Sequence, residues 1–301
     1  MDNERVDTRR LRFLLELSRH GSMRAVADVL GTTTSTVSQQ IAVLARETGV
    51  PLLEPDGRRV RLTPAGRRLA EHAVTILAAV EAAHADLDPH AEPAGTVRVA
   101  GFATAVRRSV LPAAAALAEH HPRVELRISE YEPWEAFAAL LADDIDLALT
   151  YDYDLAPASV DSTLTASPLW TARWGLAVPA ADASLARGEG ALAVFEAFRG
   201  HGWIVNSRNS ADEDVVRRLA AMAGFTPAVT HRADSLELVE DLIVTGPAPA
   251  VGLMPVGRAT QPGVTLLPLA GPEVRQRAFA CTRRGREAWP PLALVLGLLA
   301  R

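Results

Sequence analysis

The chain has 301 residues, of which 49% are hydrophobic, and carries a net charge of −5. This length accommodates two or three domains with sizeable cores. The single cysteine, Cys281, excludes an internal disulfide and a thiolate-rich metal site. All 31 basic residues are arginine, so P-loop and Schiff-base lysine chemistry are excluded. The start of the chain lacks the pattern of a signal peptide, and no apolar run reaches the ~18 residues of a membrane span. We therefore expect a cytoplasmic protein that does not bind membranes.

Residues 21–44 predict two short helices joined by a tight turn. Ala27 permits close approach of the helices, and Gly31 can take a positive φ at the turn. The second helix has Thr33 or Thr34 as its cap. Apolar residues recur along it at i, i+4 and i+7, namely Val37, Ile41 and Leu44. This pattern indicates a helix-turn-helix, with an ordinary helical hairpin as the alternative.

The outer face of the second helix carries small side chains that can reach base edges or phosphates in the major groove. These candidate DNA-binding residues are Thr34, Ser35, Ser38 and Gln39. A hairpin-turn signal at Asp56-Gly57 then precedes residues 58–63, which predict the second strand of a β-wing. The arginines of this strand, placed to meet phosphate, are Arg58, Arg59 and Arg61.

The charge is distributed unevenly along the chain. Residues 1–70 carry 12 Arg against 8 acidic residues, a net +4, whereas residues 71–301 carry 19 Arg against 28 acidic residues, a net −9. The positive part is the part with the helix-turn-helix, as phosphate contact requires. Random fluctuation over 70 residues is the alternative explanation.

Thr63-Pro64 predicts the start of a long helix that continues to about Leu87 without a breaker. Apolar residues in it are spaced 4, 3, 4, 3 and 4 apart, at Leu69, Ala73, Ile76, Val80, Ala83 and Leu87. This spacing is a heptad seam and predicts a dimerisation helix. The alternative is a helix that packs only on its own domain. A Pro-rich hinge follows at residues 88–95.

Residues 11–66 resemble the N-terminal domain of LysR-type transcriptional regulators. The matching residues are Leu11, Gly21-Ser22, Ala27, Leu30, Ser38, Ile41, Leu44, Gly49, Leu52, Arg58, Leu62-Thr63 and Ala65-Gly66. The chain departs from the family in Val26-Ala27, Leu44-Ala45 and Leu53-Glu54-Pro55, which replace Ala-Ala, Leu-Glu and Phe-x-Arg. The last departure removes an arginine that contacts the DNA backbone in the family. The resemblance implies a winged helix-turn-helix domain over residues 1–63 and a linker helix with a hinge over residues 64–94.

From Thr96 the pattern becomes an alternation of strands and helices, which predicts a parallel sheet with helices on both faces. The expected strands are 97–102, 124–129, 146–151, 174–179, 203–207, 227–232, 251–255, 265–269 and 277–283. The expected helices are 106–120, 133–143, 211–223, 234–245 and a terminal helix. The order of four motifs resembles the effector domain of the same family, which looks like a two-lobed periplasmic solute-binding protein. These motifs are Gly101 with Pro112, Asp146-Leu147-Ala148, Gly224-Phe225 with Pro227, and residues 252–255.

The resemblance implies an α/β effector-binding domain over residues 95–301, with lobe I at 95–165 and 268–301 and lobe II at 166–267. Ligands of open parallel sheets bind beyond the carboxyl ends of the strands. The candidate effector-binding residues are therefore Phe102, Ala103, Thr104, Tyr131, Tyr151, Asn206 and Ser207. By resemblance, the turn after the first strand offers backbone N–H groups and the Thr104 hydroxyl to an anionic or polar effector. Glu132, Asp152 and Asp154 make the rim acidic, unless they are solvated loop residues, and the aromatic residues can form an aromatic-lined pocket.

The sequence contains no HExxH, GxSxG or CxxC motif, so we expect no enzyme activity, no metal and no cofactor, with Cys281 a buried apolar residue. The resemblance implies a regulator that binds double-stranded promoter DNA as a homodimer or homotetramer and responds to an unidentified small-molecule effector. RNA polymerase is a further candidate partner. The alternative is a cytoplasmic solute-binding or enzymatic protein with a helical interaction module. DNA affinity that falls steeply with salt would separate the two.

Overall fold

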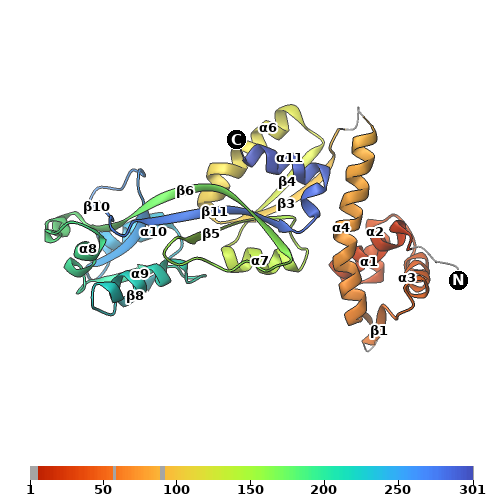
Figure 1. Cartoon of the computed structure of the whole chain (residues 1–301), viewed down its shortest axis with the longest axis horizontal. Coiled ribbons are helices and arrows are strands. Elements are labelled where there is room, and N and C mark those ends of the chain that lie inside the picture. Colours follow the sequence, from red (N-terminus) through yellow and green to blue (C-terminus); the bar gives the residue numbers. More distant parts are fainter. Residues whose placement is uncertain (1–5, 57–58, 89–91, 301) are drawn as a thin grey trace.

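The computed structural model describes residues 6–56, 59–88 and 92–300. One long helix, α4 (Pro64–Leu87), stands between a small helical domain and an elongated α/β domain (Figure 1). The small domain is the predicted winged helix-turn-helix, and the α/β domain is the predicted effector domain. The order of domains in space therefore follows their order in the chain.

Three helices and one hairpin form the small domain. They are α1 (Thr8–His20), α2 (Met23–Val29), α3 (Thr34–Thr48), β1 (Leu53–Asp56) and β2 (Arg59–Leu62). Leu14, Val37 and Leu44 are among the fully buried residues of its core. The Thr33 side chain caps α3 by accepting a hydrogen bond from the Thr36 N–H at 3.2 Å, and Gly31 has a φ of +60° at the turn. β1 and β2 pair antiparallel, which confirms the predicted wing; Arg58 lies outside the described residues.

Two sides of α4 are occupied within the chain. Ala70, Ala73 and Val74 are buried against the small domain, whose helix α1 runs beside α4. On another side, the Thr75 hydroxyl donates a hydrogen bond to the Arg284 carbonyl at 3.0 Å. Ala73 is 0% exposed in the single chain, so its prediction as a dimer-seam residue is wrong. The same heptad spacing allows α4 to pack on α1, and Ala73 belongs to the side of α4 that is buried in this way.

The α/β domain is built on one nine-stranded sheet in the order β4-β3-β5-β11-β6-β9-β7-β8, with β10 paired to β6. The strands are β3 (Gly95–Gly101), β4 (Val124–Glu130), β5 (Leu147–Tyr153), β6 (Leu164–Pro179), β7 (Gly202–Val205), β8 (Ala228–Arg232), β9 (Ala250–Pro255), β10 (Val264–Pro268) and β11 (Val274–Arg283). The strands pair parallel only in β4-β3-β5 and β8-β7-β9; β6, β10 and β11 pair antiparallel. The prediction of a parallel sheet therefore holds for the core of each lobe and fails between them.

The sheet is continuous because β6 is 16 residues long, whereas the sequence predicted only its last six residues. Residues 165–173 of this strand are half-buried or exposed, so they lack the apolar run that marks a buried strand. β6 and β11 pair over ten residue positions and carry the chain from one lobe to the other. The predicted lobe boundary at residue 165 thus falls at the start of a strand that serves both lobes.

Helices cover both faces of the sheet. The helical elements are α5 (Ala103–Ala105), the π-helical turn η1 (Val106–Val110), α6 (Leu111–His120), α7 (Pro133–Leu141), the 3₁₀ turn η2 (Ala180–Leu185), α8 (Ala191–Ala197), α9 (Ala211–Met222), α10 (Leu236–Thr245), the 3₁₀ turn η3 (Arg286–Ala288) and α11 (Pro290–Leu299). One large core lies beneath α6, α8, α9 and α11, whereas α7 and α10 each cover a smaller core. The short α8 was not predicted.

A buried carboxylate lies where α4 and the α/β domain meet. Asp146 is 2% exposed and accepts hydrogen bonds from Arg98 Nε and Nη2, both at 3.0 Å, and from Arg286 Nη2 at 3.3 Å. Burial alone would raise the pKa of Asp146, but the hydrogen bonds and charges of the two arginines outweigh it and hold that pKa below its usual range. Nearby, Arg19 Nε of α1 donates to Asp143 Oδ2 at 2.5 Å, so the small domain is tied directly to lobe I.

Candidate DNA-binding face and interlobe cleft

The outer side of the first half of α3 is a polar, uncharged surface. Because Val37, Ile41 and Leu44 are buried, the opposite side of the helix faces solvent. Its four predicted DNA-binding residues are all exposed: Thr34, Ser35, Ser38 and Gln39. Ser35 Oγ also shares a hydrogen bond of 2.8 Å with the Thr33 hydroxyl at the helix cap. This bond gives Ser35 an ordered starting position at the surface.

The wing carries a positive charge that is already paired within the hairpin. Arg61 Nε lies 2.9 Å from Glu54 Oε1, and the two residues face each other across β1 and β2. Glu54 belongs to the segment that departs from the family pattern, so this departure also supplies a competitor for Arg61. Arg59 also lies in β2, two positions before Arg61. An exposed ion pair of this kind is weak, and phosphate can displace Glu54.

Arg24 joins this surface although the sequence pattern did not single it out. It is exposed at the start of α2, and it borders a hollow whose other walls include Thr34 of α3 and Val60 of the wing. Its position next to the start of the predicted recognition helix makes it a further candidate for phosphate contact. The only sequence signal was the positive balance of residues 1–70.

A cavity of about 280 Å³ lies between the two lobes. Five of the predicted effector-binding residues line it: Phe102, Ala103, Thr104, Tyr151 and Asn206. The rings of Phe102 and Tyr151 meet edge to face at 4.6 Å between centroids, and Phe102 is 5% exposed. The carboxyl ends of β3, β5 and β7 therefore do meet at one site, as the rule for parallel strands requires.

Two predicted cleft residues lie elsewhere. Tyr131 packs with the small core beneath α7 and is not among the residues that line the cavity. It follows Glu130, which does line the cavity, and successive residues of an extended segment point to opposite faces. Ser207 is exposed, and both its hydroxyl and its N–H donate to the Asp234 carboxylate. Its contribution is to hold Asp234, which lines the cavity.

Two carboxyl groups in the cavity wall have strongly raised pKa values. Burial, together with the charge of Asp234, raises the pKa of Glu132 to about 7. Glu132 Oε2 accepts hydrogen bonds from Tyr151 Oη at 3.2 Å and Asn209 Nδ2 at 2.6 Å. Burial likewise raises the pKa of Asp212 to about 7, and Asp212 Oδ1 accepts from Tyr153 Oη at 2.7 Å.

The predicted acidic rim is only partly correct. Glu132 lines the cavity, but Asp152 accepts two hydrogen bonds from Arg277, at 2.8 and 2.7 Å, and does not line it. Asp154 accepts from the backbone N–H groups of Leu155 and Arg275. Each of these two acids comes one position after a tyrosine of β5, so its side chain points to the other face of the strand. There each acid accepts hydrogen bonds from an arginine of β11.

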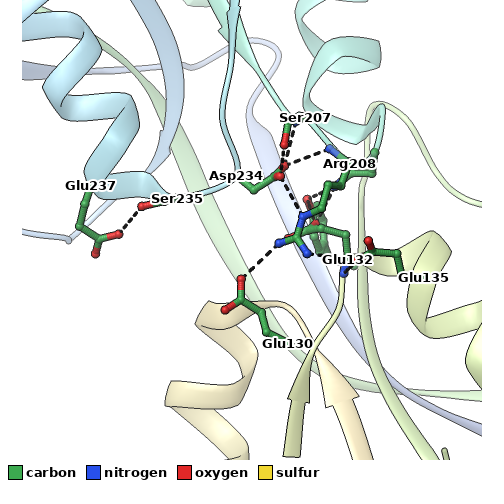
Figure 2. Close-up of polar contacts among 10 residues, drawn as sticks. Glu130, Glu132, Glu135, Ser207, Arg208, Asp234, Ser235 and Glu237 are labelled. Carbon is green, nitrogen blue, oxygen red and sulfur yellow. Dashed lines mark hydrogen bonds and ion pairs between the residues drawn. The ribbon is translucent and has the colours of Figure 1, made fainter. Parts of the chain in front are cut away.

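One arginine bridges the lobes beside the cavity. Arg208, in the turn after β7, donates from Nε to Asp234 at 3.1 Å, from Nη2 to Glu130 at 3.2 Å and from Nη1 to Glu135 at 3.3 Å (Figure 2). Asp234 belongs to lobe II, whereas Glu130 and Glu135 belong to lobe I. No sequence motif marked Arg208, because its two partners in lobe I, Glu130 and Glu135, lie more than 70 positions away in the chain.

Comparison with known proteins identifies both halves of the chain. The family profile described as "LysR substrate binding domain" matches residues 90–301. The profile described as "Bacterial regulatory helix-turn-helix protein, lysR family" matches residues 8–67. The chain belongs to the LysR family of transcriptional regulators.

Individual relatives agree with this family. The LysR-family chain is 28% identical over 291 residues to the transcriptional dual regulator GltC of Bacillus subtilis, covering 95% of this chain and 93% of GltC. Its fold is similar to a full-length OxyR variant from Pseudomonas aeruginosa, with a TM-score of 0.72 at 17% identity, covering 98% and 94% of the two chains. It is also similar to full-length CbnR complexed with its target DNA, with a TM-score of 0.53 at 20% identity, covering 97% and 98%.

Other features of this LysR-family regulator concern its cysteine and its helices. Cys281 is fully buried, and burial raises the pKa of its thiol, as expected for a residue with an apolar packing role. Within the described ranges, no helix combines the length and apolar character needed to cross a membrane.

Proposed function

We propose that this LysR-family regulator binds promoter DNA as a homodimer and changes that binding when a small molecule occupies the interlobe cavity. The observation that carries the proposal is the pairing, in one chain, of an exposed hydroxyl face on α3 with a cavity between the two lobes. The helix α4 connects the two, so a change at the cavity has a structural route to the DNA-binding face.

On the DNA side, α3 would enter the major groove with Thr34, Ser38 and Gln39 toward the bases. Hydroxyl and amide groups suit this role because they donate and accept hydrogen bonds at base edges. The arginines of the wing and Arg24 would contact the flanking phosphates, which fixes position but carries no sequence information.

Dimerisation would use the apolar side of α4 that the chain leaves uncovered. Ile76 is 38% exposed and Leu87 is 82% exposed. Val80 and Leu69 are half-buried, and Ala83 is exposed, so five of the six predicted seam residues remain available to a second helix. A two-fold axis through this seam would present two copies of α3 to two half-sites. The tetramer remains a prediction from the family.

The test starts from a random duplex pool, from which the full-length protein selects its preferred DNA. We expect two half-sites related by two-fold symmetry, and an affinity that falls steeply as salt rises. A pool without enrichment, or a flat salt dependence, contradicts the proposal.

The dimer is tested with Ile76→Asp, which places a carboxylate in the apolar seam. Leu111→Asp is the matched control, because Leu111 is 51% exposed on the effector domain. Ile76→Asp should sediment as a monomer and lose its preference for paired half-sites, whereas Leu111→Asp should behave as wild type. Wild-type sedimentation of Ile76→Asp would exclude the α4 seam.

The effector part is tested by native mass spectrometry of protein purified from its own cells. We expect a retained small molecule in the wild type, and its loss in Thr104→Val, which removes a cavity hydroxyl at nearly constant volume. Thr165→Val, at a half-buried position outside the cavity, is the control. Equal retention by both variants would exclude Thr104 from the binding site.

A further inference from the structure

The wall of the interlobe cavity is strongly acidic. Its carboxylate residues are Glu130, Glu132, Asp212, Asp234 and Glu237. Arg107 is the only arginine among the residues that line the cavity in the described part of the chain, and its Nη1 lies 3.9 Å from Glu237 Oε1. A low-dielectric cavity lined by one sign of charge concentrates ligands of the opposite sign.

The structure also shows which chemical group satisfies these carboxylates. The Arg208 guanidinium lies among Asp234, Glu130 and Glu135, and its Nη2 is 3.9 Å from Glu132 Oε1 (Figure 2). Asp234 is placed for this contact because Ser207 fixes its carboxylate from the same lobe. The chain's own cation therefore stands at the border of the cavity and bridges the two lobes.

Two amide side chains in the same wall have unsatisfied groups. Asn206 is 6% exposed; its Oδ1 accepts from the Asp212 N–H at 2.9 Å, but its Nδ2 has no hydrogen-bond partner among the described residues. Gln276 is 3% exposed; its Nε2 donates to Tyr153 Oη at 3.4 Å, and its Oε1 accepts from none of the described residues. Both residues line the cavity. Gln276 Oε1 is therefore free to accept a hydrogen bond from an ammonium or guanidinium group in the cavity, and Asn206 Nδ2 is free to donate to water or to another part of a ligand.

We propose that the cavity binds a small organic cation, whose amine or guanidinium group replaces the Arg208 side chain among the carboxylates. This inference rests on the proposed function, because it names the chemical class of the effector. The cationic group would contact Glu130, Glu132 and Asp234. The rings of Phe102, Tyr151 and Trp174 would cover the carbon skeleton and favour the positive charge. Departure of Arg208 would break the ion pairs that join the two lobes. Binding of the cation would then be coupled to the position of one lobe relative to the other.

The ionisation of the cavity supports this geometry. The pKa values of Glu132 and Asp212 are raised to about 7, chiefly by burial, so both carboxyl groups gain from a nearby cation. Several groups from other elements face Glu132: Tyr151 on β5, Glu135 on α7, Arg208 and Asn209 after β7, Asp212 on α9 and Asp234 after β8. The groups that face Asp212 are Tyr151 and Tyr153 on β5 and Asp234 after β8. Binding of a cation should therefore release protons, and its affinity should fall as the pH drops below about 7.

The experiment is isothermal titration calorimetry on the full chain with agmatine, which carries a guanidinium and an amine, and with putrescine, which carries two amines. Succinate, benzoate and Ca²⁺ are the comparison ligands. We expect at least one of the two cations to bind, with proton release that differs between buffers of different ionisation enthalpy. The anions and Ca²⁺ should not bind.

Charge variants decide between a cation site and an anion site. Arg208→Gln removes the competing cation and should tighten cation binding about tenfold, if Arg208 leaves the carboxylates in about one wild-type chain in ten. Arg208→Lys keeps the charge and should bind as wild type. Glu132→Gln and Asp234→Asn should weaken binding, whereas Glu119→Gln, an exposed change on α6, should not. Thermal denaturation of each variant verifies that it is folded.

The inference is overturned by any of three results: neither cation binds the wild type or Arg208→Gln; an anion or Ca²⁺ binds instead; or Arg208→Gln binds the cation no more tightly. The same preparations are assayed for salt-dependent DNA binding. If DNA binding is intact while the cation tests fail, only the ligand class is wrong; if DNA binding also fails, the proposed function is wrong.

Discussion

The DNA-binding face and the interlobe cavity are both polar, but they are built in opposite ways. The face on α3 consists of neutral hydroxyl and amide side chains within six residues of one helix, all in contact with water. The cavity collects carboxyl groups from segments up to about a hundred positions apart, and it buries one of them, Glu132, to 5% exposure. Neutral polar groups cost less to dehydrate than charged ones and regain hydrogen bonds when they meet DNA, whereas buried carboxyl groups need a partner charge or a proton. The two regions therefore differ in how strongly a single substitution or a change in pH should act.

The largest effect is expected at the junction between the two regions. Asp146→Asn removes the charge that neutralises Arg98 and Arg286, and breaking a buried pair in this way costs about 3–5 kcal/mol. All five tryptophans lie between residues 134 and 289, so tryptophan fluorescence during chemical denaturation reports on the effector domain alone. Because the pKa of Asp146 is lowered, the difference from wild type should persist above about pH 4 and shrink as the pH falls below that value.

Asp144→Asn is the matched control, since Asp144 is exposed in the same loop. It should change the unfolding free energy by less than about 0.5 kcal/mol. Equal effects of the two substitutions would show that the buried pair does not hold the junction.

The second effect concerns the pH dependence of the cavity. The Glu132 carboxyl keeps its proton to about pH 7 in the folded chain, but loses it near its ordinary value of 4.5 in the unfolded chain. The folded state therefore binds more protons between these values, and stability falls as the pH rises through them, by up to about 3 kcal/mol from this group. Glu132→Gln should remove this part of the pH dependence of the unfolding free energy. The stability of the variant relative to the wild type should therefore be greater at pH 8 than at pH 5. Denaturation of both proteins at the two pH values measures it, and parallel slopes would contradict the burial of an ionisable group here.

The third effect should be confined to one base pair. Gln39→Ala removes an amide that can make two hydrogen bonds to a base edge, which costs about 1–3 kcal/mol at a single position of the site. Competition assays with single-base variants of the selected duplex measure it, and ligand binding in the cavity should be unchanged. A uniform loss at every position would show that Gln39 contacts the backbone instead.

The smallest effect is expected from a single phosphate contact. Arg24→Gln should weaken binding to all sequences alike and lower the slope of log affinity against log salt by about 1. Arg127→Gln, an exposed change on β4, should leave the slope at its wild-type value. If the two variants behave alike, Arg24 does not reach DNA.

The DNA-binding domain was predictable because its determinants are close in sequence. Caps, turn glycines and apolar spacing identified the start of α3 and both ends of α4, although α3 continues to Thr48, four residues past the predicted segment. The cavity was predictable only in outline. The strand-end rule located Phe102, Thr104 and Asn206, but a one-residue alternation sent Tyr131 to the other face. Arg208 and Asp234 were missed because an ion pair between distant loops leaves no local pattern. Ala73 was instead assigned to the wrong interface, because only the fold shows that it packs in the core of the small domain.

The long pairing of β6 with β11 determines what kind of motion the two lobes can make. Two strands that share a ladder over ten positions cannot slide past each other without breaking many hydrogen bonds at once. They can bend and twist together, and the register shift between Ala278 and Phe279 marks the point where the ladder is already interrupted. A ligand that bound in the cavity would therefore act on a torsional joint, and a turn of lobe II about that joint would alter the direction in which lobe I presents α4.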